Sequence, residues 1–169
     1  AELQGDREVV LVNADALQFS EALKGDREVV LAAVAQWAGA LKYASAELRG
    51  DKEVVLAAVT RSAHVVAYAS AELQGDREVV LVNADALQFS EALKGDREVV
   101  LAAVAQWAGA LKYASAELRG DKEVVLAAVT RSAHVVAYAS AELQGDQEML
   151  LTEAQAIRAL GPLGPKAAR

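Results

Sequence analysis

The chain has 169 residues, 24 acidic and 17 basic side chains, a formal net charge of −7 and no Cys. The acidic balance argues against nucleic acid as a partner, because phosphate binding needs clusters of Lys and Arg, and the lack of Cys excludes disulfides and thiolate sites. No stretch reaches the ~18 apolar residues of a membrane span, which leaves association with a membrane-bound complex open.

The sequence is internally repetitive, and residues 1–70 and 71–140 are identical. Within each block the tetrad Gly-Asp-basic-Glu recurs at steps of 20, 25 and 25 residues. The tetrads begin at Gly5, Gly25, Gly50, Gly75, Gly95 and Gly120, and a weaker copy begins at Gly145. Each block therefore holds one short repeat of 20 residues followed by two long repeats of 25 residues. Identical blocks fit a recent duplication, an engineered array or a mis-assembled sequence equally well, and residue 1, which is Ala rather than Met, indicates a processed chain or a fragment.

The first short repeat, residues 5–24, is five residues shorter than the others, and we expect the shortening in its first helix. Asn13 and Asp15 take the places that Trp37 and Gly39 hold in the next repeat. Because Asn and Asp suit tight turns, these two residues predict a turn there.

The first long repeat, residues 25–49, contains the signals of a helical hairpin. Gly25 tolerates a left-handed conformation past a helix end, Asp26 is a predicted N-cap, and Glu28 favours the first turn of a helix. An apolar run from Val29 to Val34 predicts a first helix that is buried around most of its circumference.

A second arm is predicted after a stop at Gly39. Leu41, Ala44 and Leu48 share one face of a helix, so each long repeat reads as two helices of about ten residues. Helices this short need tertiary packing, so the sequence predicts an all-α tandem-repeat α-solenoid of short helical hairpins, with about 25 residues per repeat. In the second long repeat, His64 aligns with Gly39, and it predicts either a left-handed turn or two helices that run together.

The last part of the chain departs from the repeats. Met149, Leu150, Ala154, Ile157 and Leu160 predict a final amphipathic helix. We therefore expect a repeat array over residues 1–148, with blocks 1–70 and 71–140, a capping helical region over residues 141–160, and a flexible Gly/Pro tail over residues 161–169.

The strings Asp-Arg-Glu-Val-Val-Leu-Ala-Ala-Val at 26–34 and Ala-Leu-Lys-Tyr-Ala-Ser-Ala-Glu-Leu at 40–48 resemble a repeat of algae and other protists, domain of unknown function 4116. Residues 51–59 and 65–73 resemble a second copy, and the resemblance covers nearly all of residues 1–148.

The resemblance implies a helical repeat array, an algal or protist source and, through that source, the chloroplast as the compartment. It implies no catalytic residues. The usual Asn-Gly-type turn of the family is replaced by Trp37-Ala38-Gly39 in one repeat and by Ser62-Ala63-His64 in the next.

Candidate chemistry is sparse, and we predict no catalytic, cofactor or metal site. His64 and His134 lie one block apart and form no helical metal pair. The Asp-basic-Glu triads are explained by helix capping, since they lack the ligand spacing of a calcium loop. The Ser residues have no His and acid partners at triad spacing.

The aromatic residues are the candidates for binding. We predict Trp37, Trp107, His64 and His134 as partner-binding residues, because aromatics are enriched at binding hot spots. The Tyr residues are expected to fill the core.

Three functional hypotheses follow. The first is a non-enzymatic scaffold or linker that binds protein partners along an extended surface, with a large plastid photosynthetic assembly as one setting. The second is an engineered or consensus array with no function beyond folding. The third is a metal or ligand site between repeats.

Overall fold

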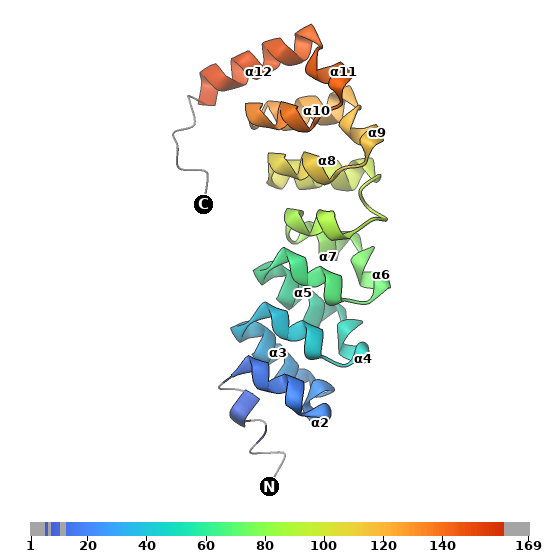
Figure 1. The fold of residues 1–169 in the computed structure, drawn as a ribbon, viewed down its shortest axis with the longest axis vertical. Coiled ribbons are helices and arrows are strands. Elements are labelled where there is room, and N and C mark those ends of the chain that lie inside the picture. Colours follow the sequence, from blue (N-terminus) through green and yellow to red (C-terminus); the bar gives the residue numbers. More distant parts are fainter. Residues whose placement is uncertain (1–5, 7, 11–12, 161–169) are drawn as a thin grey trace. The chain divides into compact units, whose positions relative to one another are not determined.

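The computed structural model describes residues 6, 8–10 and 13–160, and every regular element in these ranges is a helix (Figure 1). The chain divides into two compact units, Ala1–Ser90 and Glu91–Arg169. This division lies inside the second short repeat, residues 75–94, rather than at the border between the identical blocks. The predicted all-α class with repeated short helices is confirmed, whereas the tail predicted over residues 161–169 lies outside the described residues.

Each repeat combines α-helices with a 3-10 helix, which is labelled η. The first unit contains η1 (Ala14–Phe19), α2 (Glu21–Lys24), α3 (Arg27–Gln36), η2 (Ala38–Tyr43), α4 (Ala46–Arg49), α5 (Lys52–Arg61), η3 (Ala63–Tyr68), α6 (Ala71–Gln74), α7 (Arg77–Leu81) and η4 (Ala84–Phe89). The second unit contains α8 (Arg97–Gln106), η5 (Ala108–Tyr113), α9 (Ala116–Arg119), α10 (Lys122–Val129), η6 (Ala133–Tyr138), α11 (Ala141–Gln144) and α12 (Gln147–Leu160).

Within each unit the longer α-helices pack side by side, and the 3-10 helices form a second layer against them. In the first unit α5 contacts α3 and α7, and in the second unit α10 contacts α8 and α12 (Figure 1). Val29, Val30, Ala33 and Val34 of α3 are all buried, as the apolar run predicts. The core lies between the two layers, so one repeat cannot bury its apolar residues without its neighbours.

The second arm differs from the prediction of one α-helix of about ten residues. It is a 3-10 helix, η2, followed by an extended residue, Ala44, and a separate four-residue helix, α4. Because a 3-10 helix has three residues per turn, side chains three apart eclipse each other. Ala38, Leu41 and Ala44 therefore form one row, and all three are buried.

The corner between the arms lies at Trp37 rather than at Gly39. Trp37 has an extended backbone, with φ −144° and ψ 111°, and ends α3, while Gly39 is buried inside η2. Ser62 makes the same corner in the next repeat, with φ −158° and ψ 111°, and His64 lies within η3. The predicted stop at Gly39 and both predictions for His64 are therefore wrong.

The glycine that begins each tetrad also differs from its predicted conformation. Gly25 has φ −96° and ψ −4°, and Gly50 has φ −98° and ψ −4°, so both are right-handed. They follow the short helices α2 and α4, and the next helix begins two residues later. The left-handed conformation predicted for Gly25 is wrong, because the chain continues directly into the next N-cap.

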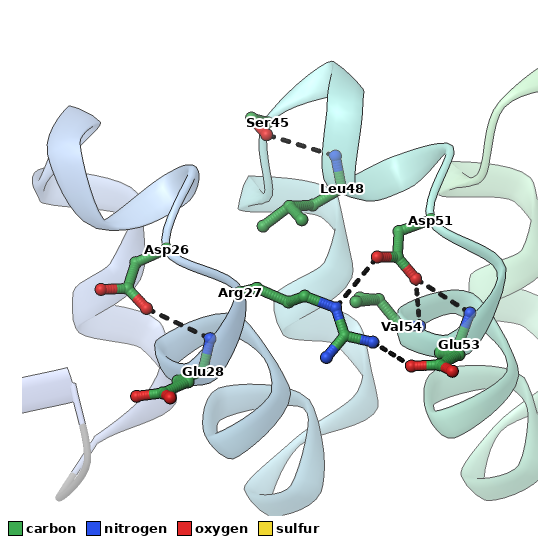
Figure 2. A network of polar contacts seen from close by, with 8 residues as sticks. All are labelled: Asp26, Arg27, Glu28, Ser45, Leu48, Asp51, Glu53 and Val54. Carbon is green, nitrogen blue, oxygen red and sulfur yellow. Dashed lines mark hydrogen bonds and ion pairs between the residues drawn. The ribbon is translucent and has the colours of Figure 1, made fainter.

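The aspartates of the tetrads that begin at Gly25 and later are helix N-caps, as predicted. The Asp26 carboxylate accepts hydrogen bonds from the Glu28 and Val29 amides, at 3.1 and 3.2 Å. Asp51 accepts from Glu53 and Val54 at 2.9 and 3.2 Å (Figure 2). Such a bond satisfies amide groups that have no partner inside the helix.

In four tetrads, those of Arg27, Lys52, Arg97 and Lys122, the basic residue bridges to the Asp and the Glu of the following tetrad. Arg27 Nε donates to Asp51 Oδ2 at 3.0 Å, and its guanidinium also contacts the Glu53 carboxylate (Figure 2). Lys52 Nζ lies 2.9 Å from both Asp76 Oδ2 and Glu78 Oε2. In the second unit, Arg97 pairs with Asp121 and Glu123, and Lys122 pairs with Asp146 and Glu148. We call this series of pairs the tetrad ladder.

A backbone hydrogen bond joins the short helices of successive repeats. The Ser45 amide donates to the Lys24 carbonyl at 2.8 Å, and the Ser70 amide donates to the Arg49 carbonyl at 2.9 Å. The Ser45 hydroxyl meanwhile accepts from the Leu48 amide at 3.3 Å and caps α4 (Figure 2). One serine therefore links two repeats and begins a helix.

The short repeat loses its five residues at two places, and not only in the first helix as predicted. Asp76 precedes Asn83 by 7 positions, whereas Asp96 precedes Trp107 by 11, so the first helix segment is four residues shorter. The fifth residue is the one that separates Tyr43 from Ser45 in a long repeat. Asn13 does begin η1, because its side chain accepts from the Asp15 amide at 3.0 Å.

The lost fifth residue changes the role of the serine. Ser90 follows Phe89 directly, and its hydroxyl is buried without a hydrogen-bond partner among the described residues. Residues 91–94 form turns rather than the four-residue helix that follows Ser45. The equivalent Ser20 likewise makes no side-chain cap.

We predict opposite effects for two serines at equivalent positions. Ser45→Ala removes a helix cap and should lower the free energy of unfolding by about 1 kcal/mol. Ser90→Ala removes a buried hydroxyl that has no partner and should leave the stability unchanged or raise it. Urea unfolding monitored by circular dichroism measures both changes. A loss of stability in Ser90→Ala as large as that in Ser45→Ala would contradict this assignment.

The tetrad ladder lowers the pKa of its aspartates. Partial burial works to raise the pKa of Asp51, but hydrogen bonds from Arg27 and from the Val54 and Glu53 amides bring it below its ordinary value of 3.8. For Asp121 the Val124 amide is the largest cause of the lowered pKa. Asp76 and Asp146 are lowered in the same way.

These lowered pKa values predict an acid limit to stability. A carboxyl whose pKa is lower in the folded chain contributes stability above the unfolded value, and loses it as the pH falls through the folded value. The urea midpoint should therefore stay level from neutral pH to about pH 5 and fall below pH 4. Asp51→Asn combined with Asp121→Asn should reduce that fall, whereas Glu47→Gln, at an exposed glutamate outside the tetrad ladder, should not. Equal acid profiles in all three proteins would refute the role of the ladder.

Candidate partner-binding site

The corner between α3 and η2 exposes an aromatic side chain. The extended backbone at Trp37 directs the chain from one layer to the other, and its side chain lies at the surface, 41% exposed. Trp107 has the same conformation and the same exposure at the corner between α8 and η5. The two tryptophans of the chain therefore occupy equivalent surface positions, one in each unit.

The indole ring of Trp37 is held in place by three neighbours. A Cβ on Gly39 would overlap the ring, so the absence of a side chain there lets the indole lie against the backbone of η2. The Tyr43 ring lies 6.2 Å away, centroid to centroid, at 53°. Lys42 Nζ lies 4.9 Å from the Trp37 ring centroid and 4.5 Å from that of Tyr43, within cation–π range.

Lys42 is charged in this arrangement. Its side-chain hydrogen bond with Tyr43 raises the pKa of Lys42 above the ordinary lysine value, although desolvation acts in the opposite direction. Lys112 lies over Trp107 and Tyr113 at the same distances in the second unit.

The corner of the next repeat lies beside each tryptophan and completes a pocket. In the first unit the pocket has a volume of about 250 Å³, and in the second about 440 Å³. The Trp37 pocket is lined by Gln36, Trp37, Ala38, Gly39, Arg61, Ser62 and His64. The Trp107 pocket is lined by Gln106, Trp107, Ala108, Gly109, Arg131, Ser132, His134, Val135 and Tyr138. Both pockets are open to solvent.

The structure brings the four predicted partner-binding residues together in pairs. Trp37 and His64 line one pocket, and Trp107 and His134 line the other. The Ser62 hydroxyl lies 3.0 Å from His64 Nδ1, which fixes the imidazole at the pocket. No group of three or more His, Asp or Glu side chains that could hold a metal ion occurs among the described residues.

The expectation that the tyrosines fill the core is wrong. Tyr68 is 36% and Tyr138 39% exposed, and Tyr43 and Tyr113 are half-buried. Because the arm is a 3-10 helix, the residues that share the buried row of Leu41 are Ala38 and Ala44. Tyr43 falls outside that row and packs on Trp37 instead.

Sequence reasoning also missed the arginines. Arg61 ends α5, is exposed and lines the Trp37 pocket, and Arg131 occupies the same place in the second unit. Neither guanidinium forms an ion pair with any residue that the structure describes. The available signal was the repeat alignment, which places Arg61 and Gln36 at the same position of adjacent long repeats.

The chain matches the family described as Domain of unknown function (DUF4116) over residues 6–49 and 96–144, more than half of its length. The chain belongs to the DUF4116 family. The matched segments include both Trp corners of this DUF4116 protein. No curated protein and no solved structure shows significant similarity to it. Within the described residues, no helix has the length and apolar character needed to cross a membrane.

We predict that Gly39→Ala displaces the Trp37 indole. The added methyl group would overlap the ring, whereas the backbone of η2 accepts alanine, so the effect should be local. In a Trp107→Phe background, where Trp37 is the sole emitter, the fluorescence should shift to the red and acrylamide quenching should increase.

Gly25→Ala is the matched control, because a Cβ there meets no atom within 4 Å. It should leave the fluorescence unchanged and the stability equal or higher, since alanine restricts the unfolded chain. Unchanged emission in Gly39→Ala would contradict the packing of the indole on Gly39.

Proposed function

We propose that this DUF4116 protein is a non-enzymatic scaffold or linker that holds protein partners on a repeated helical surface. The observation that carries the proposal is the pair of equivalent pockets, each with a solvent-exposed indole held in one orientation. An exposed indole keeps a large apolar area in contact with water, and a partner that covers this area would gain binding free energy. Aromatic side chains held in fixed positions on a surface are therefore suited to binding a partner.

The rigidity of the pocket supports this role. Trp37 rests on Gly39 and Tyr43. The repeat that completes the pocket is tied to the Trp37 repeat by the Arg27–Asp51 ion pair and by the hydrogen bond from the Ser70 amide to the Arg49 carbonyl. A preorganised surface loses little conformational entropy on binding, so more of its contact energy appears as affinity.

The competing hypotheses have less support. An array selected only for folding gains little from a tryptophan that is 41% exposed, because a buried or polar residue at the corner would serve stability better. A metal site between repeats would rest on one imidazole per pocket, since His64 and His134 line different pockets. The algal plastid assembly stays a prediction based on the family resemblance.

The proposal predicts that the protein sediments with a larger assembly in its native source. A mild-detergent extract separated on a density gradient, with the protein followed by mass spectrometry, should place it far from its own mass of 17.7 kDa. Chemical cross-linking before extraction should join it to the same co-migrating subunits. A protein that remains at its own mass under both conditions would refute a permanent scaffold role.

A further inference from the structure

We infer that the Trp37 and Trp107 pockets each bind an acidic segment of a partner protein, in which a carboxylate adjoins an aromatic or aliphatic side chain. This inference rests on the proposed scaffold function and names the chemistry of its partner. It follows from the charge, the apolar surface and the size of the two pockets.

The charge of the pockets is opposite to that of the chain. The chain carries a net charge of −7, yet no Asp or Glu lines either pocket, and each contains one Arg and one His. Arg61 and Arg131 form no ion pair with a described residue, whereas Arg27 and Arg97 are held by two carboxylates each. A free guanidinium at a pocket rim is suited to bind a carboxylate through two parallel hydrogen bonds.

The apolar part of each pocket determines which type of side chain can lie next to that carboxylate in the partner segment. The partly exposed Trp37 side chain, Ala38 and Gly39 line the apolar part of the first pocket, and Val135 and Tyr138 extend the corresponding part of the second. An aromatic or aliphatic side chain placed on the indole buries apolar area and leaves its neighbouring carboxylate near the guanidinium.

The size of the pockets favours a peptide segment over a cofactor. Small-molecule pockets span roughly 300–1,000 Å³, so the Trp37 pocket, at about 250 Å³, lies below this range, and the Trp107 pocket, at about 440 Å³, lies in its lower part. An open pocket of this size holds one or two side chains while the rest of the segment crosses the surface. Two equivalent pockets predict two bound segments per chain.

A peptide-display selection tests the inference. A library of random twelve-residue peptides is selected on the full chain and depleted on the Trp37→Ala/Trp107→Ala variant. The recovered peptides should share an Asp or Glu next to an aromatic or aliphatic residue. Recovery of basic peptides, of apolar peptides without carboxylates, or of no enriched sequence would overturn the inference.

Affinity measurements on the recovered peptide assign the contacts. Fluorescence anisotropy of the labelled peptide should show two sites per chain, and Arg61→Gln alone should leave one. Arg61→Gln with Arg131→Gln should weaken binding by at least about tenfold, the loss expected for a hot-spot residue. Arg158→Gln, at an exposed arginine of α12 outside both pockets, should leave the affinity unchanged. Because both pocket arginines are exposed, their replacement should leave the urea midpoint unchanged.

The density gradient separates failure of this inference from failure of the proposed function. If the Trp37→Ala/Trp107→Ala protein still sediments with the assembly, the scaffold function stands and the pocket assignment is overturned. If the unaltered protein sediments alone, the scaffold function itself fails. We expect the unaltered protein to sediment with the assembly and the Trp37→Ala/Trp107→Ala protein to sediment without it. We also expect the selection to recover acidic peptides.

Discussion

The structure depends on an aspartate carboxylate that performs two tasks, in the four repeats that begin with the tetrads of Asp51, Asp76, Asp121 and Asp146. Asp51 accepts hydrogen bonds from the first amides of α5, and it also pairs with Arg27 of the preceding repeat. The first task sets the residue at which the helix begins, and the second ties that helix start to the previous one. Single exposed ion pairs contribute little stability, so the importance of the tetrad lies in fixing the register between neighbours as well as in capping.

Fixing each helix at its start leaves its other end free to vary. α5 runs for ten residues and α7 for five, yet Asp76 caps α7 and pairs with Lys52 as Asp51 caps α5 and pairs with Arg27. The shortening of the short repeat therefore falls beyond the tetrad, in the last part of the first helix segment and at the serine junction. It is accommodated at the corner by Asn83, whose side chain caps η4 and donates to the Val59 carbonyl at 3.2 Å.

The parts of the fold that sequence reasoning predicted are those decided by contacts between near neighbours in the chain. The Asp26 cap joins residues two and three positions apart, and the buried face of α3 follows from the apolar run itself. The second arm was predicted as one α-helix because Leu41, Ala44 and Leu48 fit that period. In the structure Leu41 belongs to a 3-10 helix, Ala44 is extended, and Leu48 belongs to a separate four-residue helix. Arg27 and Asp51 are 24 positions apart, so their pairing depends on how the repeats stack and could not be predicted from neighbouring residues in the sequence.

The candidate site arises because two different long repeats alternate. Trp37-Ala38-Gly39 in one repeat and Ser62-Ala63-His64 in the next occupy the same corner, so stacking places an indole beside an imidazole and Arg61. Sequence reasoning selected Trp37 and His64 separately as unusual residues, but their contact with one pocket requires knowledge of the stacking. An array built from only one of these repeats would place a tryptophan corner beside another tryptophan corner, or a histidine corner beside another histidine corner. Alternation is therefore what combines an apolar wall with a cationic rim, and the short repeat, with Asn83 and Asp85 at that corner, does not supply the same combination.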